Sequence, residues 1–155
     1  MTEKFLEKLK EAERILKTAD HMAYVSFPLI KDKNLLIKIL SQTKTVITNC
    51  INSILQYEYL YKRIKLYKDT KVNLKTFEEK CSQRYKISKE EINLIKELFD
   101  IHDRHKKSQM EFMRHEKIVI MSKNLETKSI AIDKIKIFIT LAKNILKKTR
   151  FNILR

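Results

Sequence analysis

The 155-residue chain contains no glycine and a single proline, Pro28. Phosphate-cradling loops, dinucleotide-binding fingerprints and nucleophile elbows all need glycine, so enzymes built on them in their usual form are excluded. The 34 basic and 19 acidic residues give a net charge of +15, which favours a polyanionic partner, although an AT-rich genome would also enrich lysine.

The length fits one domain, and 43% of the residues are apolar, so we expect residues 1–155 to form a single folded unit. The charged start at Glu3 and Lys4 is unlike a secretory leader. No apolar run approaches the roughly 20 residues of a membrane-spanning helix. We therefore expect a cytoplasmic protein without a transmembrane segment.

The first helix is predicted from Thr2 to Phe27, where Pro28 should end it. Within this stretch, apolar residues recur at alternating spacings of four and three and therefore share one helical face. These residues are Phe5, Leu9, Ala12, Leu16, Ala19 and Ala23.

The second helix is predicted over residues 34–67, because a four-and-three apolar seam runs from Leu36 to Ile64 without a helix breaker. A helix of this length needs a long partner. The partner is either another helix of the chain or a second copy, so we consider a homodimer through this helix.

Two further helices are predicted in the middle of the chain. A short helix should cover residues 74–85. Ser88 and Glu91 have the spacing of a capping box, which predicts that a fourth helix begins there and extends to about Lys107.

The pattern changes before the last helix. Residues 117–121 and 129–132 are rich in β-branched side chains and predict a small β-hairpin, with its turn at residues 122–124. The last helix should begin after Asp133. The predicted fold class is therefore all-α: an antiparallel bundle of four main helices with a short extra helix and a small β-hairpin insertion.

Charge is distributed unevenly along the chain. Residues 62–89 contain ten basic and three acidic side chains, and residues 134–155 contain seven basic and no acidic ones. Bases near a helix C-terminus suit the helix dipole, but Lys134 and Lys136 belong to the first turn of the last helix. We therefore predict that this helix contacts an anion. The candidate residues are Lys134, Lys136, Lys143, Lys147 and Lys148.

Aromatic and basic residues alternate near the end of the second helix. At 100° per residue, four of them fall on the side opposite the apolar seam: Tyr59, Lys62, Arg63 and Tyr67. Such a group could stack on bases and contact phosphates, as single-stranded nucleic-acid binders do. The alternative interpretation is a face that is solvated or covered by the short third helix.

Two histidines, His102 and His105, lie three residues apart on the fourth helix and share one side of it. A metal site would need further ligands in a suitable arrangement. His102 lies on the apolar face, where a buried histidine is more common than a ligand. We expect neither a metal site nor a cofactor.

Arg14 and His21 are separated by six residues and lie two helical turns apart on one face. HEPN nucleases carry an arginine followed after four to six residues by a histidine, so this spacing, in a charged helical bundle with a long second helix, resembles the HEPN superfamily. The resemblance implies an RNA-cleaving site at a dimer interface, with His21 as general base and Arg14 stabilising the transition state. The stretch from Ala12 to Met22 is also similar to the opening of an uncharacterised archaeal helical family.

These patterns leave three functions open. The first is a non-catalytic module that binds RNA or a ribonucleoprotein assembly through its basic surfaces. The second is a HEPN-like ribonuclease that uses Arg14 and His21. The third is a helical adaptor that joins a protein assembly.

Overall fold

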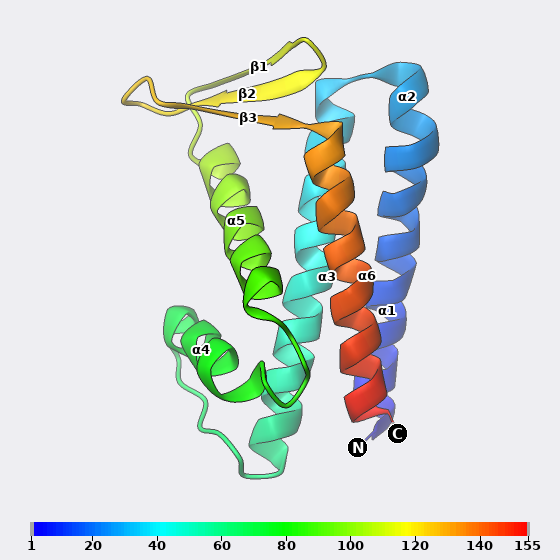
Figure 1. The fold of residues 1–155 in the computed structure, drawn as a ribbon, viewed down its shortest axis with the longest axis vertical. Coiled ribbons are helices and arrows are strands. Elements are labelled where there is room, and N and C mark those ends of the chain that lie inside the picture. Colours follow the sequence, from blue (N-terminus) through cyan, green and yellow to red (C-terminus); the bar gives the residue numbers. More distant parts are fainter. Residues whose placement is uncertain (1, 155) are drawn as a thin grey trace.

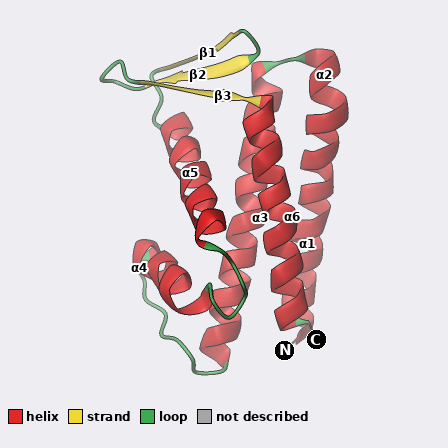
Figure 2. Ribbon diagram, viewed as in Figure 1, coloured by secondary structure: helices red, strands yellow, loops and turns green. Residues whose placement is uncertain are grey.

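The computed structural model describes residues 2–154 and is mostly helical, with one small antiparallel sheet (Figures 1 and 2). The elements in chain order are α1 (Thr2–His21), a π-helical turn (Met22–Ser26), α2 (Phe27–Ile30), α3 (Lys33–Leu60), α4 (Thr70–Thr76), a second π-helical turn (Phe77–Cys81), α5 (Lys89–Lys106), β1 (Met110–Arg114), β2 (Lys117–Met121), β3 (Thr127–Ala131) and α6 (Ile132–Ile153). The prediction of a mainly helical chain is confirmed.

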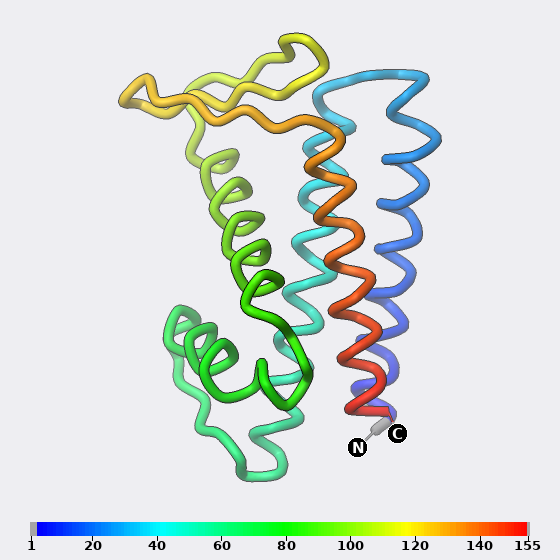
Figure 3. Tube along the Cα trace, in the orientation of Figure 1, coloured from blue at the N-terminus to red at the C-terminus, as the bar shows by residue number. Residues whose placement is uncertain are grey.

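Helix α6 lies among the other long helices. It packs against α1, α3 and α5, and α3 also packs against α1 and α5. Helix α1 runs towards the sheet, whereas α3 and α6 run away from it, so both termini lie at the end of the molecule opposite the sheet (Figure 3).

The core consists of the apolar faces that the sequence predicts. All six residues of the predicted face of the first helix are buried, and Leu9, Ala12, Ala19 and Ala23 are completely buried. The seam of the second helix is likewise buried from Leu36 to Ile54. Since burying a leucine or isoleucine side chain contributes about 1.5–3 kcal/mol, these faces hold the helices together.

The prediction that Pro28 ends the first helix is wrong. The Phe27 N–H donates to the Met22 carbonyl, five residues back, and this wider turn precedes the proline. Pro28 lies in the first turn of α2. A proline is tolerated there because backbone N–H groups in the first turn have no acceptor within the helix. The helical path ends at Lys31, whose left-handed conformation (φ 53°) lets its N–H donate to the Phe27 carbonyl at 2.8 Å.

The second helix is shorter than predicted, because α3 ends at Leu60 and not at Tyr67. Two hydrogen bonds close its end: Lys62 N–H donates to the Tyr59 carbonyl at 2.9 Å, and Arg63 N–H to the Glu58 carbonyl at 3.0 Å. These bonds form a Schellman motif with Lys62 in the left-handed position (φ 59°). Glycine normally marks that position, so the sequence carries no visible stop signal there.

The sheet has three strands in the order β1-β2-β3, so the predicted two-stranded hairpin is incomplete. The missing strand, β1, has the sequence Met-Glu-Phe-Met-Arg and no β-branched residue, which is why the pattern did not predict it. Three isoleucines, Ile118, Ile120 and Ile130, are buried on the face of the sheet towards the helices.

The middle of the chain follows the predictions in part. The short helix begins at Thr70, where Asp69 accepts a hydrogen bond from Lys71 N–H at 2.9 Å. The capping box is confirmed: Ser88 and Glu91 each accept a hydrogen bond from the backbone of the other at 3.1 Å.

Left-handed residues recur at the turns. Among residues 2–154 they are Lys31, Lys62, Lys86, His115, Glu116 and Leu125. Each non-glycine residue in this region costs roughly 1–2 kcal/mol, so a chain without glycine carries strain at its helix ends and hairpin turns. Lys86 closes a second Schellman motif, with Ile87 N–H donating to the Ser82 carbonyl at 2.8 Å.

We predict that Lys86→Gly raises the free energy of unfolding by about 1 kcal/mol, because glycine removes the left-handed strain. The matched control is Lys10→Gly, which removes the same charge from an exposed position inside α1 and should lower the free energy of unfolding by about 1 kcal/mol. Urea denaturation measures both. Two losses of equal size would contradict the strain at Lys86.

Candidate nucleic-acid interface

A basic pocket lies where the start of α1 meets the end of α3, at the end of the molecule that carries the termini. It has a volume of about 620 Å³, and we call it the lysine pocket. Its lining residues are Lys4, Phe5 and Lys8 from α1, Gln56, Tyr59 and Leu60 from α3, and Lys62, Ile64 and Lys65 from the loop that follows. No acidic residue is among them.

The four lysines of this pocket are unneutralised. None of them forms an ion pair with any residue in the described range 2–154. Lys4 and Lys8 stand one helical turn apart, a spacing at which like charges repel. The pocket is therefore an electropositive site that an anion would stabilise.

The floor of the lysine pocket is apolar and one aromatic side chain stands at its edge. Phe5 and Ile64 are buried, and the ring of Phe5 meets Tyr57 edge-on at 5.7 Å. Tyr59 is 52% exposed. An exposed ring beside cations can stack on an unpaired base while lysines contact the phosphates on either side of it.

The structure separates the four residues that the helical pattern grouped at the end of α3. Tyr59 and Lys62 line the lysine pocket, whereas Arg63 and Tyr67 do not. Because α3 ends at Leu60, the helical rotation of 100° per residue does not describe the positions of the residues beyond it. Tyr67 lies in the loop before α4 and is exposed, with its backbone bonded to the Asn73 side chain at 2.7 and 2.9 Å.

Arg63 belongs instead to a cluster around a buried carboxylate. The side chain of Glu58 is 3% exposed, and its two oxygens meet Arg63 Nη1 at 2.6 Å and Arg84 Nε at 3.4 Å. Arg63 also lies over the Tyr61 ring at 5.1 Å. The two arginines neutralise Glu58 and join the end of α3 to the turn that precedes α5.

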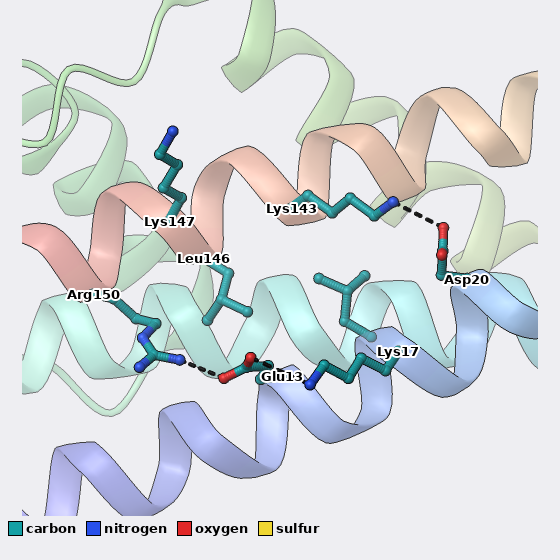
Figure 4. A pocket seen from close by; sticks show the side chains of 8 residues that line it. Glu13, Lys17, Asp20, Lys143, Leu146, Lys147 and Arg150 are labelled. Carbon is teal, nitrogen blue, oxygen red and sulfur yellow. Dashed lines mark hydrogen bonds and ion pairs between the residues drawn. The ribbon is translucent and has the colours of Figure 1, made fainter.

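Three lysines and one arginine of α6 form ion pairs with acidic residues of other helices. The pairs are Lys134–Glu97 at 3.0 Å, Lys143–Asp20 at 2.9 Å, Lys148–Glu91 and Arg150–Glu13. Figure 4 shows the Lys143–Asp20 and Arg150–Glu13 pairs, which line a pocket of about 400 Å³ between α1 and α6. These ion pairs fasten α6 to α1 and α5 and reduce the positive charge that the sequence assigned to this helix.

The two remaining candidate lysines of α6 differ from each other. The ammonium of Lys136 lies 4.6 Å from the centre of the Tyr24 ring, a cation–π contact. Lys147 is exposed and has no ion-pair partner within residues 2–154, so it is the α6 lysine best placed to meet an external anion.

Sequence reasoning missed Lys4 and Lys8, and it included Lys65 only as one of the ten bases of residues 62–89. The first twenty residues contain equal numbers of acids and bases and therefore appeared neutral. The pair at 4 and 8 beside the core residue Phe5 was a visible signal, but nothing local to α1 indicates that residues 62–65 lie opposite.

Arg14 and His21 are both exposed on α1, and neither lines the lysine pocket. The guanidinium of Arg14 is engaged by the Glu11 carboxylate through two hydrogen bonds, at 2.5 and 3.0 Å. Hydrogen bonding to Glu11 raises the pKa of Arg14. His21 is the last residue of α1.

Of the two histidines of α5, His102 is buried in the protein and His105 contacts a glutamate. His102 is 8% exposed, and burial, aided by Lys44 and Lys106, lowers its pKa to about 4. His105 Nδ1 lies 2.7 Å from Glu111 Oε2 and so links the end of α5 to β1. In the described part of the chain, no group of three or more His, Cys, Asp or Glu side chains is arranged to hold a metal ion.

Both cysteines are buried, so neither is an exposed nucleophile. Burial raises the pKa of Cys50 to about 12 and that of Cys81 to about 11, which keeps both thiols protonated near neutral pH.

No protein-family model, curated protein or solved structure matches the chain. The HEPN and archaeal resemblances therefore stay predictions from the sequence. Within residues 2–154, every helix is too short or too polar to cross a bilayer.

In the Glu58 cluster, we predict that removing the two arginines costs more free energy of unfolding than removing the charge of Glu58. The double variant Arg63→Ala with Arg84→Ala leaves a buried carboxylate unpaired and should lower the free energy of unfolding by about 3 kcal/mol. Glu58→Gln leaves two arginines that reach water and should lower it by only about 1 kcal/mol. Urea denaturation compares them, with the exposed Lys75→Ala as control. A larger loss for Glu58→Gln than for the double variant would contradict this assignment.

His102 predicts a pH dependence of stability. Its ordinary pKa is near 6.5 and its folded-state pKa is about 4, so the unfolded chain binds the proton more tightly. The free energy of unfolding should therefore fall as pH falls from about 6.5 to about 4. His102→Gln should flatten this slope, whereas His21→Gln should retain it. Unfolding curves across this pH window measure the effect, and an unchanged slope in His102→Gln would refute it.

Proposed function

We propose that the chain is a cytoplasmic, non-catalytic module that binds single-stranded RNA, alone or within a ribonucleoprotein, through the lysine pocket. The scaffold of this proposal is a single-domain antiparallel bundle of four main helices. The observation that carries it is the convergence of four unpaired lysines and one exposed tyrosine around a pocket without acids.

The charge of the pocket favours a ligand with several phosphates. Lys4 and Lys8 belong to α1, and Lys62 and Lys65 belong to a loop more than fifty residues later, so the cations approach the pocket from two sides. A strand that runs between them could place phosphates against both pairs. Contacts with about four phosphates of a single strand correspond to a slope of roughly −3 in a plot of log affinity against log salt.

Tyr59 favours a single strand over a duplex, because stacking needs an unpaired base. Stacking on an aromatic side chain contributes about 1–3 kcal/mol per base and tolerates many sequences. Leu60 and the apolar floor at Phe5 line the pocket with apolar surface against which a base can lie.

Two variants test this proposal by fluorescence anisotropy with a short labelled single-stranded RNA. Tyr59→Ala should weaken binding about tenfold, the equivalent of roughly 1.4 kcal/mol of stacking. Lys62→Gly with Lys65→Gln should reduce the salt slope by about 1.4, since two phosphate contacts are lost. Glycine at position 62 also relieves the left-handed backbone, so this loss cannot be attributed to unfolding.

The control is the double variant Lys38→Gln with Lys106→Gln, which removes the same two positive charges from exposed positions outside the pocket. This control should keep nearly all of the affinity. If the two double variants weaken binding equally, RNA binds by general charge and the pocket assignment is wrong. Labelled DNA of the same sequence shows whether the pocket needs the 2′-hydroxyl.

The same RNA distinguishes the other two functions. Cleavage of the RNA that is lost in His21→Ala would favour the HEPN-like ribonuclease with Arg14 and His21, in place of a non-catalytic binder. An absence of binding at every salt concentration would favour the protein adaptor. Sedimentation with and without RNA measures the homodimer that was predicted through the second helix.

A further inference from the structure

The sheet presents an exposed face at the end of the molecule opposite the lysine pocket. Since the buried Ile118, Ile120 and Ile130 face the helices, the alternating residues of each strand face outwards. We call these residues the outer sheet face: Met110, Phe112 and Arg114 of β1, Lys117, Val119 and Met121 of β2, and Thr127, Ser129 and Ala131 of β3. None of the nine is acidic.

Large apolar side chains form neighbouring pairs on this face. Met110 stands opposite Met121, and Phe112 stands opposite Val119. Met110 is 57% exposed and Phe112 is 36% exposed, so the outer part of this apolar area lies on β1 and contacts solvent. Contiguous exposed apolar surface of this kind marks an interaction site more often than a free surface.

A pair of like charges stands beside the apolar pairs. Arg114 and Lys117 are directly opposite in the register of β1 and β2, an arrangement that destabilises a sheet unless an anion neutralises it. The acids near them already have partners: Glu116 pairs with Lys31 at 2.6 Å, and Glu97 pairs with Lys134. Neither base forms an ion pair within residues 2–154.

The tip of α2 adds two further apolar side chains at the same end. Leu29 and Ile30 are 81% and 65% exposed. The ion pair between Lys31 and Glu116 fastens this tip to the turn between β1 and β2. Figure 1 shows α2 and the sheet together at the end remote from the termini.

We propose that the outer sheet face and the α2 tip dock on an anionic lipid bilayer. The apolar area of the sheet and the apolar side chains of the α2 tip suit a bilayer, into whose interface both can insert. Arg114 and Lys117 suit the negative headgroups of such a surface. This proposal does not depend on RNA binding, because the lysine pocket lies at the other end of the molecule.

The chain contains no tryptophan, so one introduced tryptophan reports its own surroundings. Phe112→Trp should show a blue-shifted emission with vesicles of phosphatidylcholine and phosphatidylserine, and no shift with phosphatidylcholine alone. Tyr59→Trp, placed in the lysine pocket, should show no shift with either vesicle. General electrostatic attraction between a basic protein and an anionic vesicle would not insert the sheet face into the bilayer. The blue shift therefore distinguishes docking of this face from such attraction.

Vesicle sedimentation provides the second measurement. Leu29→Gln with Ile30→Gln, and separately Arg114→Gln with Lys117→Gln, should each weaken binding to the anionic vesicles about tenfold. Lys62→Gly with Lys65→Gln should leave it unchanged. All six of these positions are exposed. Circular dichroism verifies that each variant is folded.

Two results would overturn the proposal. One is an unshifted emission for Phe112→Trp in the presence of bound anionic vesicles. The other is a loss of vesicle binding in the lysine-pocket variant as large as that in the sheet variants. RNA affinity of the sheet variants, measured in parallel, separates a failure here from a failure of the proposed RNA-binding function.

Discussion

The packing of α6 among α1, α3 and α5 is the constraint on which the distribution of charge in this protein depends. Helix α6 buries a broad apolar face that includes Phe138, Ala142 and Ile145. Once this face is buried, the basic side chains at its margins lie beside the neighbouring helices. Acids of α1 and α5 meet them there, so Lys134, Lys143, Lys148 and Arg150 of α6 are neutralised by side chains of other helices.

Two groups of bases without an ion pair among residues 2–154 lie at opposite ends of the molecule. At the end with the termini, lysines of α1 and of the loop after α3 surround a pocket without acids. At the other end, Arg114 and Lys117 face each other across two strands. The proposed RNA contact and the proposed bilayer contact both use bases that have no ion pair among residues 2–154.

The absence of glycine has a different consequence in the structure from the one that the sequence indicates. It excludes glycine-dependent phosphate loops, but it does not remove left-handed turns from the fold. Lysines occupy three of these positions, at the ends of helical segments near residues 31, 62 and 86. One of them, Lys62, also lines the lysine pocket, so the turn that ends α3 directs a positive charge towards the proposed ligand.

The sequence by itself determined the apolar faces of the helices, the capping box at Ser88 and the hairpin of strands β2 and β3. These features depend on residues a few positions apart, and periodicity and capping rules describe such distances well. It did not determine where α3 ends, because lysine replaces the usual glycine signal at position 62. Only the tertiary structure decided which bases are neutralised, since the partners of α6 lie up to 137 residues away and the lysine pocket joins segments that no local pattern relates.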